Sequence, residues 1–474
     1  MLSLDTFRNP PDNCRGTDFW MLNDKLDDDE LRRQLRSMRG QGVASVIART
    51  YIGLKSDYPG EEFHRKMRVT VDAAREIGIK IFLQAGYMPE AVVGLPPEFA
   101  ISNLMPLSGD EARQSVREGR GRILATAGGV AYTAVNTGTF LDMLDREAMA
   151  FYLERSYGEM WKAFADEFGK TCVSVWVDEP SYSPKGLPWS RSIPEAFRRQ
   201  WGYDLGPKVE ALFRDVPGCE TVRYHYWRVV QELLDHAYFE QVRDWCHAHG
   251  LLFSGHLMME DTLGSQLLRA GAAMPYYKYF DIPGIDVLTG ETHWHSNPMP
   301  RRTPGVHYNC GFYTTPLQCA SAAHQAGKER VLAEMYGVTS ESFGLLEQKN
   351  MFDHFAALGI NHRSVHGIFY SLRGRGKRAF PPHVSDFQPY WTLPGTHRLR
   401  RARELFRPPH PGTRPPSASP SPKAAVPWSS SPTAERPPET GMRQPETAAP
   451  LSTRSATSRA ASAPSRIPPA SASS

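Results

Sequence analysis

The stretch Cys172-Val173-Ser174-Val175-Trp176-Val177-Asp178-Glu179-Pro180 has the pattern of a buried β-strand that ends on two acids. A second stretch, Arg330-Val331-Leu332-Ala333-Glu334-Met335-Tyr336, repeats this arrangement later in the chain. An ionised acid inside a buried strand would cost several kcal/mol without a partner, so we expect these acids at strand ends. Two strands that carry acids at their C-terminal ends predict a paired-carboxylate site at the mouth of a barrel.

Strand-like and helix-like patterns alternate along the chain outward from these two stretches. The predicted strands cover residues 17–22, 43–48, 79–84, 172–177, 251–255, 330–333 and 364–370, with weaker candidates near Ala272 and Ile285. Helical patterns lie between them, at residues 61–77, 146–168 and 224–249 and after a capping pair, Asp27 and Glu30. About eight strands separated by helices predict an α/β fold, the (β/α)₈ TIM barrel. An open, doubly wound sheet is the alternative, but no GxGxxG motif follows the first strand.

The composition changes abruptly after Trp391. Residues 392–474 consist largely of Pro, Ser, Ala, Arg and Thr. Such a segment cannot bury enough apolar surface to offset the entropy of ordering it, which predicts a disordered tail. A frameshift that replaced accessory domains would produce the same change. We therefore expect a catalytic domain over residues 1–391 and a tail over residues 392–474.

Charge and cysteine usage exclude several classes of protein. Residues 392–474 hold 12 Lys and Arg against 4 Asp and Glu, which leaves 43 basic and 47 acidic residues in the rest of the chain. That acidic balance argues against a nucleic-acid partner. No apolar run is long enough to span a membrane, and the polar N-terminus has no secretory signal. Six scattered cysteines without a CxxC pair indicate reduced thiols in a cytoplasmic protein.

Glu179 and Glu334 are the candidate catalytic residues. Pro180 ends the first strand after Glu179, and burial against nearby aromatic rings would raise the pKa of this acid, as a general acid requires. Asp178 alternates to the other face of that strand, where it would hold the site together. Each acid could instead be a salt-bridged structural residue. Asp286 is either a subsite acid or a turn residue.

Other polar and aromatic side chains near the predicted strand ends suit contacts with a sugar. His256 follows Gly255, and it would bind a sugar hydroxyl or Glu334, or serve only as a buried structural residue. The spacing of His256 and Glu260 lacks the second His of a typical metal motif, so no metal ligand is assigned. The candidate substrate-binding residues are Asn23, Arg49, Asp178, His256, Glu260, Trp294, Tyr336, His366 and Tyr370.

The order of these motifs resembles that of TIM-barrel glycoside hydrolases related to family 106, the α-L-rhamnosidase family. The matching motifs include Phe19-Trp20-Met21-Leu22-Asn23-Asp24, Val177-Asp178-Glu179-Pro180, Ser254-Gly255-His256, Pro283-Gly284-Ile285-Asp286, Ala333-Glu334 and Gln388-Pro389-Tyr390-Trp391. The resemblance implies a barrel that acts on glycosides, with Glu179 and Glu334 as the catalytic pair. It also implies that Ca²⁺ is a possible ligand and that further folded domains follow Trp391, where this chain departs from the pattern.

These observations predict a glycosidase with a carbohydrate substrate. In the retaining mechanism that we expect, Glu179 is the general acid/base and Glu334 is the nucleophile. A non-catalytic or truncated carbohydrate-binding barrel is one alternative. A metal-dependent hydrolase or lyase with a TIM barrel is another.

Overall fold

The computed structural model describes residues 10–84, 86, 88, 91–182, 185–287, 311–337 and 345–373. All of them belong to one compact unit, Met1–His410. The predicted substrate-binding residue Trp294 and the predicted tail, residues 392–474, lie outside the described residues. The proposal of one catalytic domain over residues 1–391 therefore stays a prediction.

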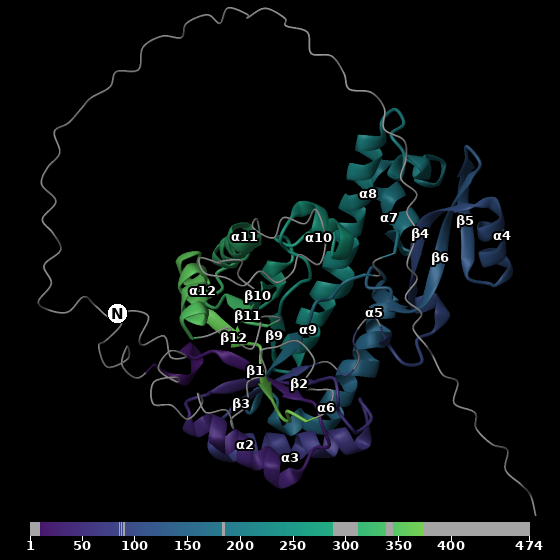
Figure 1. Cartoon of the computed structure of the whole chain (residues 1–474). Coiled ribbons are helices and arrows are strands. Elements are labelled where there is room, and N and C mark those ends of the chain that lie inside the picture. The colour runs from purple at the N-terminus through teal and green to yellow at the C-terminus, as the bar shows by residue number, and fades with distance from the viewer. Residues whose placement is uncertain are drawn as a thin grey trace, which may run out of the picture. The chain divides into compact units, whose positions relative to one another are not determined.

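Parallel strands form a nearly closed barrel, in the order β12-β11-β10-β9-β7-β3-β2-β1-β13 (Figure 1). The last two strands are the halves of one interrupted strand: β12 pairs with β11, and β13 pairs with β1. The strands are β1 (Thr17–Leu22), β2 (Ser45–Thr50), β3 (Lys80–Gln84), β7 (Cys172–Val177), β9 (Leu252–Gly255), β10 (Ile282–Asp286), β11 (Leu332–Met335), β12 (His362–Val365) and β13 (Ile368–Phe369). The predicted TIM barrel is confirmed.

Helices connect successive strands of the barrel. The first, α2, begins at Asp27, whose carboxylate accepts hydrogen bonds from the backbone N–H groups of Asp29 and Glu30. It buries Leu31, Leu35 and Met38, which lie on one face at helical spacing. The helices around the barrel are α2 (Asp28–Gly40), α3 (Glu61–Ile77), α5 (Arg146–Tyr152), α6 (Gly158–Phe164), α8 (Cys219–Leu234), α9 (Glu240–Ala248), α10 (Leu263–Arg269), α11 (Gly311–Gln325) and α12 (Leu345–Ala357).

Two of the predicted long helices each contain a π-helical turn. Leu153–Tyr157 joins α5 to α6, and Asp235–Phe239 joins α8 to α9. The strand expected near Ala272 was wrong, because this residue lies between α10 and a 3₁₀ turn at Tyr277–Tyr279. Gly271 and Pro275 flank this position and favour a turn over a strand.

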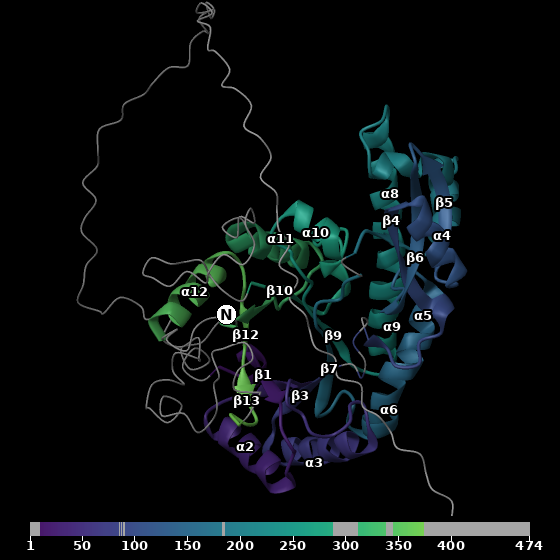
Figure 2. The ribbon, with the colours of Figure 1, turned by 45° about the vertical axis from the view of Figure 1, so that its right-hand side comes forward.

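The insertion between β3 and α5 supplies three strands of a second sheet, and β8, which follows β7, supplies the fourth; the sequence did not predict this sheet. Its antiparallel order is β5-β6-β4-β8, and Figure 2 shows it with α4 at one side of the barrel strands. A capping box between Ser108 and Glu111 starts α4. The elements of this region are β4 (Ala100–Ser108), α4 (Gly109–Arg117), β5 (Gly121–Ala127), β6 (Val130–Leu141), β8 (Leu187–Trp189) and α7 (Ile193–Trp201).

Two apolar clusters hold the barrel together. The larger one lies between the strands and the helices. The smaller one fills the barrel interior and consists of Phe19, Met21, Ile47, Phe82, Trp176, Ile282, Leu332 and Phe369. Because the interior is packed with side chains, the barrel is a solid core with room for a site only at its ends.

The described cysteines, Cys14, Cys172, Cys219, Cys246 and Cys319, are free thiols. Among the described residues, no helix is both long and apolar enough to cross a membrane.

Candidate active site

The inward-facing positions of the barrel change from apolar to polar toward the C-terminal ends of the strands. Side chains alternate along a strand, so residues two positions apart share a face. Leu332 lies in the interior cluster, and Glu334 therefore also points inward; Trp176 places Asp178 in the same way. TIM-barrel enzymes carry their active sites at this end. The polar inward positions include Arg49, Asp178, His256, Asp286 and Glu334.

A buried network of charged groups joins four of these side chains. The Nε2 atom of His256 lies 2.7 Å from Oε2 of Glu334 and 3.4 Å from Oδ1 of Asp178. Arg49 forms an ion pair with the other oxygen of Asp178. Asp178, His256 and Glu334 are 5%, 1% and 3% exposed, so each charge depends on its neighbours for compensation.

The contacts of His256 determine where its protons lie. Its Nδ1 atom lies 3.0 Å from the carbonyl oxygen of Leu257, which can only accept, so Nδ1 donates this hydrogen bond. Its Nε2 atom faces two carboxylates. Burial disfavours the imidazolium, but the charges of Asp286, Glu334 and Asp178 outweigh burial and raise the pKa of His256 well above its usual value. His256 is therefore a cation.

The contact with His256 also determines the charge of Glu334. Burial would raise the pKa of Glu334, but the hydrogen bond and the charge of His256, helped by Arg49, lower it below the usual value. Glu334 is thus an ionised carboxylate inside the barrel mouth. Such a group can attack an anomeric carbon or activate a water.

Gly255 permits the close approach on which this network depends. Its φ is +149°, a conformation that L side chains rarely adopt. A Cβ atom here would also overlap the carbonyl oxygen of Val177 on the neighbouring strand. The glycine lets the end of β9 lie directly against the end of β7, and so brings His256 to Asp178.

Glu179 differs from the two buried acids because it is only half-buried. Its φ of +51° is left-handed, which strains a residue with a side chain and turns the backbone where the strand ends. Burial raises the pKa of Glu179, and the charges of Asp178 and Glu334 act in the same direction. The carboxyl group of Asp286 lies close enough to share a hydrogen bond with it.

Glu260, a predicted substrate-binding residue, is bound on both oxygens by the protein itself. Oε1 accepts from the backbone N–H of Leu257 at 3.1 Å and from the hydroxyl of Tyr277 at 3.3 Å. Oε2 accepts from the backbone N–H of Asp286 at 3.0 Å. Glu260 is 2% exposed, and burial raises its pKa to about 7. It ties the ends of β9 and β10 together.

Asn23 and Tyr370 lie where the barrel closes. The side-chain amide of Asn23 donates to the carbonyl of Ser371 at 2.7 Å and accepts from its N–H at 2.8 Å. The Tyr370 hydroxyl accepts from the backbone N–H of Asp27 at the start of α2. These two side chains are used in joining the last strand to the first.

Tyr336 and His366 complete the predicted set among the described residues. Tyr336 follows β11 with a φ of +78°, and its hydroxyl donates to the carbonyl of Gln348 on α12. His366 packs its ring against Tyr51 and Phe369, and burial lowers its pKa, so its imidazole is neutral. Trp294 is outside the described residues.

Asp178, His256 and Glu334 offer ligand atoms that lie within 4.8 Å of one another. Ca²⁺ prefers six to eight oxygen ligands, whereas this set offers an imidazole nitrogen and two carboxylates, one of which is paired with Arg49. The donor set does not fit Ca²⁺, and no chemical step is derived through a metal.

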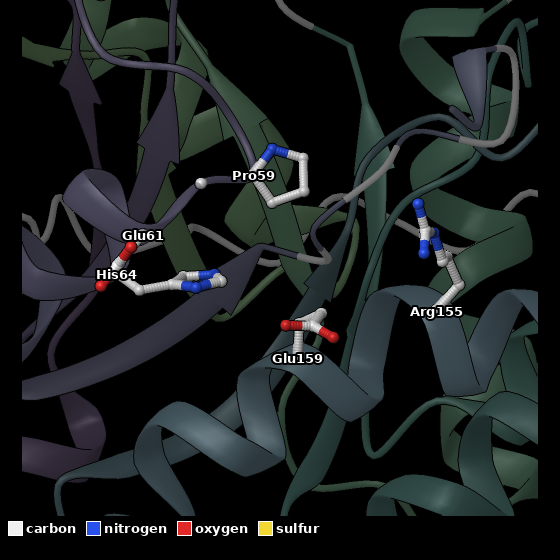
Figure 3. A pocket seen from close by; sticks show the side chains of 6 residues that line it. Pro59, Glu61, His64, Arg155 and Glu159 are labelled. Atoms are coloured by element: carbon white, nitrogen blue, oxygen red, sulfur yellow. The ribbon is translucent and has the colours of Figure 1, made fainter. Parts of the chain in front are cut away.

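A separate pocket of about 430 Å³ lies beside the barrel (Figure 3). Glu61 and His64, at the start of α3, line one side, and Arg155 and Glu159 line the opposite side. Burial lowers the pKa of His64. None of the charged residues at the strand ends lines this pocket.

The sequence left two roles open for Asp286, a subsite acid or a turn residue. It is the register partner of Glu334 across β10 and β11, so the two side chains stand next to each other on the inner face. The available signal was the acid at the end of a strand, the same pattern that identified Glu179 and Glu334.

The parallel barrel and the acids at its C-terminal mouth define the architecture of a TIM-barrel glycoside hydrolase. Residues 127–371 match the model of the family described as alpha-L-rhamnosidase, glycoside hydrolase family 106, and the chain belongs to this family.

Comparison with solved structures gives the same fold. The chain is similar to a rhamnosidase from Novosphingobium sp. PP1Y, with a TM-score of 0.62, 14% identity, and coverage of 85% of this chain and 60% of that one. It is also similar to a polyextremophilic β-galactosidase from the Antarctic haloarchaeon Halorubrum lacusprofundi, with a TM-score of 0.48, 11% identity and coverage of 82% and 57%. The chain thus spans about three fifths of the rhamnosidase. No curated protein matches the sequence.

Proposed function

We propose that this protein hydrolyses glycosidic bonds of α-L-rhamnosides, with Glu179 as the general acid and Glu334 as the opposing carboxylate. The observation that carries the proposal is the contrast between these two acids at one barrel mouth. The pKa of Glu179 is raised and that of Glu334 is lowered. Paired acids whose environments push their pKa values apart serve as acid and base or nucleophile. The choice of sugar rests on the family description.

Glu179 is suited to donate a proton to the leaving oxygen. It is half-buried, and burial raises its pKa, which favours a carboxyl group that holds a proton and is still reached by solvent. In the proposed step, the glycosidic oxygen takes this proton as the bond to the anomeric carbon breaks. General acid catalysis of this kind contributes about 10²- to 10⁴-fold to a rate.

Glu334 would stabilise the positive charge that develops on the sugar ring, or attack the anomeric carbon as a nucleophile. His256 holds it ionised at 2.7 Å, and Asp178 with Arg49 balances the charge of His256. This chain of contacts also fixes the orientation of the Glu334 carboxylate. The arrangement supports a carboxylate that is ready for reaction before substrate arrives.

The retaining mechanism stays a prediction. The anomeric configuration of the sugar as it is first released identifies the role of Glu334. ¹H NMR of the freshly released sugar measures its anomeric configuration. Retention assigns Glu334 as the nucleophile, and inversion assigns it as the base that activates water.

The proposal is tested by turnover of p-nitrophenyl α-L-rhamnopyranoside. We expect Glu179→Gln and Glu334→Gln each to lower kcat/KM by at least about 10²-fold. Glu167→Gln is the matched control, because Glu167 is a buried acid paired with Arg75 just before β7, at the opposite end of the strand from Glu179. Wild-type turnover in both active-site variants would overturn the assignment. No turnover by the wild-type chain on any aryl glycoside would favour a carbohydrate-binding barrel.

A further inference from the structure

Among the described residues, the ion pairs at the barrel mouth leave two carboxyl groups without an ion-pair partner of their own. Arg49 pairs with Asp178, and His256 pairs with Glu334. His366 is neutral because burial lowers its pKa. Within the described part of the chain, these two pairs are balanced, and Glu179 and Asp286 remain as the extra acids. Two carboxyl groups in contact cannot both ionise without a large electrostatic cost.

The backbone holds Asp286 firmly at this point. It is the last residue of β10 and the register partner of Glu334 on β11. Its N–H donates to Oε2 of Glu260 at 3.0 Å, and the other oxygen of Glu260 binds the N–H of Leu257. The Glu260 carboxylate thus fixes the spacing between the ends of β9 and β10.

The side chain of Asp286, in contrast, is not fully satisfied by the protein. Its Oδ1 atom is buried and has no hydrogen-bond partner within the part of the chain that the structure describes. The carboxyl group of Glu179 is within hydrogen-bonding reach of the same side chain. A buried carboxylate oxygen without a donor is costly, and protonation of the group removes most of that cost.

We propose that Asp286 and Glu179 form one acid unit that holds a single proton between them and supplies it to the glycosidic oxygen. The inference rests on the proposed function and adds to it a residue that acts through Glu179. Asp286 is therefore a positioning residue for the proton. When the unit protonates the leaving oxygen, both of its carboxyl groups are briefly ionised. The water that completes hydrolysis gives its hydroxyl to the sugar and its proton back to the enzyme.

Other titratable groups surround this unit, and each affects its proton. The cation of His256 favours ionisation of both acids. Glu334 disfavours ionisation of both, and Asp178 disfavours that of Glu179. Burial is nevertheless the largest influence, and it raises the pKa of Asp286 well above its usual value. Burial thus raises the pKa of both acids, and two carboxyl groups in contact titrate as a unit.

Infrared difference spectroscopy tests the shared proton without any substrate. The spectrum of the wild-type protein minus that of Asp286→Asn, and likewise minus that of Glu179→Gln, is expected to show at pH 7 the carbonyl stretch of one protonated carboxylic acid. The bands of Glu260 and Asp142, whose pKa is raised to about 7, cancel in these differences. In each variant the new amide donates to the remaining carboxylate, which then ionises. The Glu334→Gln variant is expected to keep the band. A difference spectrum without this band for both Asp286→Asn and Glu179→Gln would overturn the proposal.

The pH profile of kcat/KM tests the same unit in catalysis. With Asp286→Asn, Glu179 can no longer share a proton, so the basic limb is expected to move down by at least about one pH unit, as for other coupled acids. A merely structural role would lower kcat/KM at all pH values and leave the limb in place, which would contradict the proposal. If Glu179→Gln itself has wild-type turnover, the proposed function fails, whereas the infrared result still decides whether the proton is shared.

Discussion

Replacement of His256 by Asn tests the charge network at the barrel mouth. His256 is the main source of positive charge for Glu334, through a 2.7 Å contact between buried groups. Without it, burial dominates, and the pKa of Glu334 should rise. A hydrogen bond to a charged group is worth about 1.5–3 kcal/mol. Because 1.36 kcal/mol corresponds to about one pKa unit, we expect a rise of about 1–2 units.

The assay is the pH dependence of kcat/KM on an aryl α-L-rhamnoside. Glu334 must be ionised to act, so activity is lost as the pH falls through its pKa. His256→Asn should therefore move the acidic limb to higher pH by about 1–2 units. At acidic pH the loss should reach about 10- to 100-fold, and it should shrink as the pH rises.

His247→Asn is the matched control for this experiment. His247 also pairs with an acid, Asp281, at 2.8 Å, but it lies on α9 and is half exposed. Its replacement should leave the acidic limb in place. The reasoning is refuted if His256→Asn folds, remains active and keeps the acidic limb of the wild-type protein, because His256 would then not control the ionisation of Glu334.

Three further perturbations follow from the structure. Burial raises the pKa of Asp142 to about 7 from a usual 3.8, so the folded state binds more protons than the unfolded state between these values, and stability falls as pH rises through that window. Asp142→Asn should flatten the dependence of Tm on pH between about 4 and 7; an unchanged slope would contradict this. Gly255→Ala should lower the free energy of unfolding by about 2–4 kcal/mol in urea titrations, because the residue has a φ of +149° and no room for a Cβ atom. Arg49→Met should destabilise the protein by about 3–5 kcal/mol by leaving Asp178 buried without its cation, and the double variant with Asp178→Asn should recover part of that loss. Equal stability of the single and double variants would show that the ion pair is not coupled.

The barrel could be predicted from the sequence because its strands are apolar and are separated by amphipathic helices. The boundaries of residues 17–22, 61–77 and 172–177 were each predicted to the residue. The antiparallel sheet of residues 100–141 was not predicted. The strands of such a sheet are half exposed, and their pairing depends on contacts within the insertion rather than on a strong local pattern.

The candidate site could be predicted only in part. Acids after apolar runs identified Glu179 and Glu334, because an acid next to a buried strand requires a special environment. The contacts of Glu260 could not be predicted, since two of its three partners, Leu257 and Asp286, offer backbone N–H groups that every sequence contains. Alternation was used to place Asp178 on the face opposite Glu179, whereas in the structure Asp178 points inward in line with Trp176. The left-handed turn that redirects Glu179 is a property of the folded backbone.

The central claim is that Glu179 donates a proton to the leaving oxygen. The most direct test measures kcat/KM for Glu179→Gln on aryl α-L-rhamnosides whose phenol leaving groups differ in pKa. A good leaving group departs without protonation, so the variant should approach wild-type activity on the 2,4-dinitrophenyl substrate. On the phenyl substrate it should lose about 10²- to 10⁴-fold. The same loss on both substrates would contradict the claim and would remove Glu179 from the role of general acid.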